Sequence, residues 1–114
     1  MEVKEKVLYP EYDNAQSFYG KATIKKYYEN NILQKIELYS YKTLVLTIAN
    51  NKYNLNYEIK ENLLFSNTTL RHIKECLLQY FWIHNNEKLT TKLTKQNIIK
   101  YNNTEWYKID AQKF

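Results

Sequence analysis

The residues with the clearest chemical potential in this chain occupy one short segment, 66–72, which reads S-N-T-T-L-R-H. A helix that starts here would present free backbone amides and the positive end of its dipole, and both attract anions. Arg71 and His72 add charge and donors beside the hydroxyl of Thr68, so a phosphate or a carboxylate could dock at this point. The competing interpretation is an ordinary cap, in which Ser66 or Asn67 offers the N-cap oxygen and Thr68 and Thr69 accept other free amides. Arg71 would then lie in solvent.

The other reactive side chains form no recognisable catalytic or metal-binding pattern. His72 and His84 lack a third ligand at a matching spacing, so they do not predict a metal site. The single cysteine, Cys76, lies beside an apolar stripe, which is typical of a buried structural thiol. The glutamates are scattered, and the chain has neither a phosphate-binding loop nor a nucleophile elbow. We therefore expect no enzyme, no metal and no cofactor.

The segment 66–72 opens the one long helix that the sequence predicts. Apolar residues recur at helical spacing over about 67–83, and a shorter helix is expected over 94–101. Upstream, apolar and polar residues alternate in three ranges that predict strands, 17–28, 32–39 and 53–59, while 43–49 is apolar on both sides and predicts a central strand. Asn-Asn pairs, at 30–31, 50–51, 85–86 and 102–103, mark turns in a chain with a single glycine, and short turns between strands imply antiparallel pairing.

These elements predict one α+β domain over 1–114. It would hold an antiparallel sheet of four to five strands, packed by the main helix and by the short C-terminal helix. Residues 1–16 read as irregular, apart from a short edge strand at 7–9. The N-terminus has no apolar signal-peptide core, and no segment approaches the roughly 18 apolar residues of a membrane helix. We therefore expect a cytoplasmic protein without membrane contact.

The polar face of the first two predicted strands is unusually rich in tyrosine and lysine. Tyrosine is rigid and amphipathic, and protein-binding surfaces use it often. Aromatic side chains interleaved with cations also describe a stacking platform for single-stranded nucleic acid, and a third interpretation is ordinary cross-strand pairing. The candidate partner-binding residues on and beside this face are Tyr19, Lys21, Lys25, Tyr27, Lys35, Tyr39 and Tyr41, to which the helix start adds Thr68, Arg71 and His72.

The charge balance does not decide between these interpretations. The formal net charge is +5, from 17 basic and 12 acidic residues, and Arg71 is the only arginine. Lysine is a hydrated point charge, whereas arginine is the usual residue for bidentate recognition of phosphate or guanine. Mild basicity is compatible with a nucleic-acid surface and equally with plain solubility.

Three short motifs carry a resemblance to a known kind of protein. They read F-Y-G-K-A at 18–22, S-Y-K-T at 40–43 and S-N-T-T-L-R-H-I at 66–73. This combination resembles a small uncharacterised accessory domain of phages and plasmids from low-GC Gram-positive bacteria. The resemblance covers residues 17–80, departs from the pattern at 76–78, and weakens after His84.

The resemblance implies a function through binding. It implies a mobile-element accessory protein that inhibits a host defence complex, most specifically an anti-CRISPR protein acting on a Cas nuclease or on its guide RNA. The alternative is a nucleic-acid-binding regulator of the phage or plasmid itself. No catalytic residue follows from the resemblance. An exposed strand edge or tyrosine face would equally support a homodimer.

Overall fold

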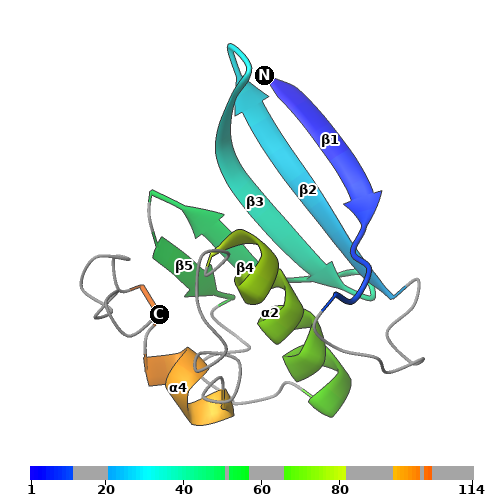
Figure 1. The fold of residues 1–114 in the computed structure, drawn as a ribbon, viewed down its shortest axis with the longest axis vertical. Helices are drawn as coiled ribbons and strands as arrows, with labels where there is room; N and C mark the ends of the chain where they lie inside the picture. The colour runs from blue at the N-terminus through cyan, green and yellow to red at the C-terminus, as the bar shows by residue number, and fades with distance from the viewer. Residues whose placement is uncertain (12–20, 51, 57–65, 82–93, 101, 104–114) are drawn as a thin grey trace.

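The computed structural model describes residues 1–11, 21–50, 52–56, 66–81, 94–100 and 102–103, and shows one sheet packed by helices (Figure 1). Five strands pair in chain order, and every pair is antiparallel. The predicted α+β class is therefore confirmed. The strands are β1 (Glu2–Val7), β2 (Ala22–Glu29), β3 (Ile32–Ser40), β4 (Thr43–Ala49) and β5 (Lys52–Leu55), and the helices are α2 (Asn67–Tyr80) and α4 (Lys95–Lys100).

The N-terminal strand β1 corrects the prediction of an irregular segment. It pairs with β2 along its whole length, from Glu2 opposite Tyr28 to Val7 opposite Thr23. Its side chains are exposed or half-buried, so the sequence shows no alternation between apolar and polar positions that would reveal a strand. The chain then enters the core, because Leu8 is buried and its amide donates to the Ala22 carbonyl at 2.9 Å.

Asparagine makes the turns, as predicted. Asn30 and Asn31 between β2 and β3 have φ of 53° and 66°, and Asn50 after β4 has φ of 54°. These left-handed conformations suit the tight turns that join antiparallel strands. The turn between β3 and β4 is the exception, because Tyr41 adopts φ of 59° without the short polar side chain that eases this conformation. The pair 85–86 lies outside the described residues.

One face of the sheet packs against α2 and forms the core. Ile24, Leu38 and Leu46, from three neighbouring strands, are almost fully buried, and Ile73 and Leu77 meet them from the helix. The predicted inward faces are therefore confirmed where the helix covers the sheet. Figure 1 shows that β1, β2 and the start of β3 extend past the end of α2. At the start of β3, the predicted inward positions Ile32 and Gln34 are exposed.

Both helices begin where the sequence predicts. Ser66 caps α2 by accepting the Thr69 amide at 3.2 Å, and the helix ends at Tyr80 rather than near 83. Thr94 Oγ1 accepts the Asn97 amide at 3.1 Å at the start of α4. Neither described helix has the length and apolarity needed to cross a membrane.

Two contacts join distant parts of the chain to this core. Tyr53 of β5 donates its hydroxyl to the carbonyl of Ile98 in α4 at 2.6 Å, which fastens the C-terminal helix to the sheet. Gln79 of α2 donates its side-chain amide to the Tyr9 carbonyl at 2.9 Å, which fastens the segment after β1 to the helix.

Candidate functional site

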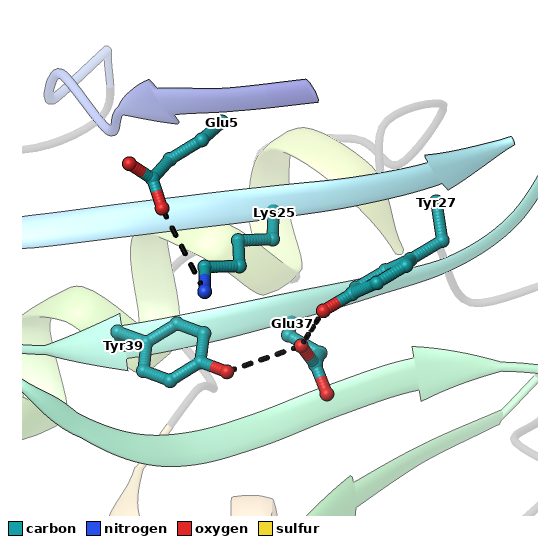
Figure 2. Close-up of polar contacts among 5 residues, drawn as sticks. All are labelled: Glu5, Lys25, Tyr27, Glu37 and Tyr39. Atoms are coloured by element: carbon teal, nitrogen blue, oxygen red, sulfur yellow. Dashed lines mark hydrogen bonds and ion pairs between the residues drawn. The ribbon is translucent and has the colours of Figure 1, made fainter. Parts of the chain in front are cut away.

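The sheet face opposite α2 carries most of the predicted tyrosine and lysine surface, and we call it the outer face. Strand register places Glu5, Lys25 and Glu37 in one row across β1, β2 and β3, and places Tyr27 opposite Lys35. Figure 2 shows the side chains of this face on one side of the strands, with α2 behind the sheet; it draws Glu5, Lys25, Tyr27, Glu37 and Tyr39. We call the following six residues the outer-face network: Glu5, Lys25, Tyr27, Lys35, Glu37 and Tyr39.

Glu37 is the centre of this network. Its Oε1 accepts hydrogen bonds from the hydroxyls of Tyr27, at 2.5 Å, and Tyr39, at 3.1 Å (Figure 2). Its Oε2 lies 3.8 Å from Lys35 Nζ. The Glu37 side chain is only 13% exposed, so the phenols and the ammonium replace much of its hydration. One carboxylate therefore fixes three neighbouring side chains.

The two lysines also lie over the tyrosine rings. Lys35 Nζ is 4.5 Å from the centroid of Tyr27, and Lys25 Nζ is 4.9 Å from that of Tyr39. Lys25 also pairs with Glu5 at 3.8 Å (Figure 2). A cation over an aromatic face contributes about 0.5–1 kcal/mol at an exposed site. Each ring therefore has a cation over one face and a hydroxyl held by Glu37.

The electrostatics keep both phenols protonated. The hydrogen bond to Glu37 is the main reason that the pKa of Tyr27 rises to about 12, and burial and the charge of Glu37 add to it. Burial raises the pKa of Tyr39, and the nearby negative charge of Glu37 raises it further. Neutral phenols donate at physiological pH and do not act as bases. The two phenols therefore serve as hydrogen-bond donors to Glu37 on an amphipathic surface.

The structure therefore brings four predicted residues together on the outer face: Lys25, Tyr27, Lys35 and Tyr39. A second group lies at the turn between β3 and β4, where the Tyr41 amide donates to the Lys21 carbonyl at 2.6 Å and the Tyr41 ring is 6.1 Å from that of His72. Tyr19 lies outside the described residues.

The expectation that His72 adds to an exposed anion site is wrong. The side chain is fully buried, and its Nδ1 lies 2.8 Å from Ser40 Oγ, which is also 3.0 Å from Thr69 Oγ1. The helix turns His72 toward the end of β3, next to the core residue Ile73, so the imidazole is not exposed to an external ligand. Arg71 is exposed on the same helix.

The structure supports the cap interpretation of the helix start. Ser66 accepts the Thr69 amide, as expected of an N-cap, and Thr68 is half-buried in the first turn of α2. Docking of an anion there stays a prediction. Cys76 is fully buried, and burial raises the pKa of its thiol, as a structural cysteine requires. Within the described ranges, no three histidine, cysteine or acidic side chains lie together as metal ligands.

Sequence reasoning placed Glu37 on the correct face but missed its role as the common acceptor. The register of the strands could have revealed this role. The two-residue turn at Asn30 and Asn31 places Glu37 opposite Lys25, so that Glu37 lies between Tyr27 and Tyr39. The role of Ser40 had no such signal, because its partners lie on a helix far along the chain.

The comparisons with known proteins identify a family whose function is unknown. The model of a family of unknown function, DUF8033, matches residues 7–100. The match covers β1 only at its last residue and takes in every other described strand and helix. No curated protein and no solved structure matches the chain.

Proposed function

We propose that this chain, which belongs to the DUF8033 family of unknown function, is a non-catalytic protein that binds another protein through its outer face. The observation that carries the proposal is the outer-face network, in which Glu37 holds two tyrosines and one lysine in fixed positions.

Preorganisation is the first physical reason. Binding costs about 0.5–1.5 kcal/mol for each mobile side chain that it immobilises. Tyr27 and Tyr39 are already held by Glu37, so a partner that packs on them meets less of this cost. Tyrosine is also enriched among residues that dominate protein interfaces.

Charge balance favours a protein over a nucleic acid on this face. The network contains two lysines and two glutamates, and both lysines lie close to a carboxylate. A phosphate backbone would meet little net positive charge here, and that charge supplies most non-specific affinity for nucleic acid. The lysines also occupy ring faces on which bases would stack.

The resemblance to phage and plasmid accessory domains suggests the identity of the partner. We propose that the partner belongs to a host defence complex in the bacterial cytoplasm, and that the protein inhibits it as an anti-CRISPR protein. This narrower proposal rests on the short motifs of the sequence, and the protein-binding proposal does not depend on it.

A pull-down from the lysate of a bacterial host with active defence systems tests both proposals. Half of the lysate is treated with nuclease, and we expect the same partner protein from both halves. Tyr27→Ala combined with Tyr39→Ala should abolish capture, as should Thr47→Arg, which places a bulky side chain on the outer face beside Glu37. Tyr9→Ala should not, because Tyr9 is 62% exposed and its carbonyl contacts Gln79 of α2, on the opposite side of the sheet.

The outcomes separate the two proposals. Recovery of nucleic acid alone, lost on nuclease treatment, would overturn the protein-binding proposal, as would capture that survives both outer-face variants while circular dichroism shows a folded protein. Capture of a protein that has no part in defence, together with unchanged interference by CRISPR effectors in cells, would overturn only the anti-CRISPR proposal.

A further inference from the structure

A second concentration of charge lies on the opposite side of the sheet, at the edge formed by β1 and β2. We define the helix-side lysine patch as Lys4 and Lys6 of β1 with Lys26 of β2, seated on Tyr28 and Tyr80. Register places Lys4 directly opposite Lys26, and alternation along β1 places Lys6 on the same face. Lys4 and Lys6 are exposed and Lys26 is half-buried, so all three reach the surface.

The tyrosine rings hold the three ammonium groups in place. Lys6 and Lys26 both lie over Tyr80, the last residue of α2, with Nζ at 5.8 Å and 4.6 Å from the ring centroid. Lys4 Nζ lies 5.2 Å from the centroid of Tyr28 on the neighbouring strand. The patch therefore joins two strands and the end of a helix into one cationic surface.

This arrangement carries a cost that the fold alone does not explain. Like charges directly opposite each other on neighbouring strands destabilise a sheet. Within the described part of the chain, no carboxylate lies at ion-pairing distance from these three lysines, whereas Lys25 and Lys35 of the outer face each pair with a glutamate. The negative end of the α2 dipole attracts cations near Tyr80, but it does not account for Lys4, whose aromatic partner lies on β2.

We propose that the helix-side lysine patch binds the phosphate backbone of a nucleic acid without reading its sequence. Lysine offers a point charge that suits phosphate, and contacts to phosphates carry no direct sequence information. The phosphates of a nucleic-acid strand form a row of evenly spaced anions. Lys4 and Lys6 along β1, with Lys26 opposite Lys4 on β2, offer cations at regular positions that such a row can contact. The site is independent of the proposed protein-binding surface, because it lies on the other side of the sheet.

Fluorescence anisotropy with a labelled single strand, and with its duplex, measures this binding directly. For three phosphate contacts, the slope of log affinity against log salt should be about −2 for the single strand and about −2.7 for the duplex. Changing Lys4, Lys6 and Lys26 together to Gln should weaken binding at low salt at least about tenfold and flatten the slope toward zero.

A matched variant controls for net charge. Lys42, Lys52 and Lys100 lie away from the patch, at the turn between β3 and β4, on β5 and on α4, and changing all three to Gln removes the same charge. We expect this variant to bind less than about threefold more weakly than the natural protein. An equal loss in both triple variants would overturn the proposal, because attraction would then follow net charge alone.

A charge reversal separates binding from folding. Lys4→Glu places a carboxylate opposite Lys26, which should leave the thermal midpoint unchanged or raise it while binding falls at least about tenfold. Retained binding by a folded Lys4→Glu protein would overturn the proposal. The absence of binding to either nucleic acid at low salt would also overturn it. If polyglutamate displaced the labelled strand as effectively as unlabelled nucleic acid did, the ligand would be an acidic protein and the proposal would again be overturned. The Thr47→Arg variant should bind nucleic acid normally, so failure of one surface is distinguishable from failure of the other.

Discussion

Replacing Glu37 by Gln tests whether one carboxylate organises the outer-face network. Gln keeps an oxygen that accepts from Tyr27 and Tyr39 but removes the charge that strengthens both bonds. Hydrogen bonds to a charged group contribute about 1.5–3 kcal/mol, against about 0.5–1.5 kcal/mol for neutral pairs. The ion pair with Lys35 adds at most about 0.5 kcal/mol, because that lysine is 40% exposed. Solvent screens the face, so we expect the free energy of unfolding in urea to fall by about 1–1.5 kcal/mol.

The same variant should change how stability depends on pH. Because the pKa of Tyr27 is raised to about 12 from 10.0, the phenol stabilises the folded protein below pH 10, and this contribution is lost as the pH rises through 12. Gln at position 37 removes the main cause, so the pKa of Tyr27 should return toward 10.0. Near-ultraviolet absorbance measures phenolate formation as the pH is raised. The part of this titration that occurs at the highest pH comes from Tyr27, and in the variant it should move to lower pH.

Glu5→Gln is the matched control for this experiment. It removes one carboxylate from the same network, but Glu5 is 61% exposed and contacts Lys25 without a phenol. We expect it to change the free energy of unfolding by less than about 0.5 kcal/mol. If Glu37→Gln unfolds at the same urea concentration as Glu5→Gln, and its tyrosines titrate as in the natural protein, Glu37 does not organise the face.

Three further substitutions test other features of the fold. Tyr41→Asn should raise the free energy of unfolding in urea by about 0.5–1 kcal/mol, because φ of 59° suits Asn better than Tyr, while Tyr9→Asn at an ordinary φ should change it by less than about 0.5 kcal/mol. Tyr53→Phe removes the bond to the Ile98 carbonyl and should lower it by about 1–2 kcal/mol, with faster hydrogen exchange of the α4 amides. Ser40→Ala removes a buried oxygen that contacts both Thr69 and His72 of α2, and it should lower the free energy of unfolding by about 1–3 kcal/mol. A urea midpoint equal to that of the natural protein would show that these hydrogen bonds do not stabilise the fold.

The sequence predicted those features that repeat along the chain. Alternation identified the buried faces of β2, β3 and β5, including Ile24, Leu38 and Tyr53, because a half-covered sheet imposes a period of two. The Asn-Asn pairs identified the turn at 30–31 because few residues other than glycine accept a positive φ.

The features that depend on contacts between distant segments were not predictable in this way. β1 is held by its backbone ladder while its side chains stay largely exposed, so it leaves no pattern in the sequence. α2 buries the polar residues His72 and Gln79 as well as its apolar stripe, because Ser40 and the Tyr9 carbonyl meet them. From the sequence, His72 was a candidate for an anion site at the helix start, because its contact with Ser40 leaves no local pattern.

The sequential order of the strands has a consequence for the way the protein folds. The three turns from β2 to β5 are short, so their ladders form with little loop-closure entropy, and low contact order favours fast folding. β1 is different, because the segment between it and β2 is long and its anchor at the Tyr9 carbonyl needs Gln79 from α2. We expect the β2–β5 meander to form early and the N-terminal strand to dock late.

In this folding order, the two surfaces would form at different stages. The tyrosines and Glu37 of the outer-face network belong to β2 and β3, so they assemble with the early meander. The helix-side lysine patch needs β1 and the end of α2 together, so it is complete only in the fully folded chain. A partially folded molecule would therefore present the first surface before it presents the second.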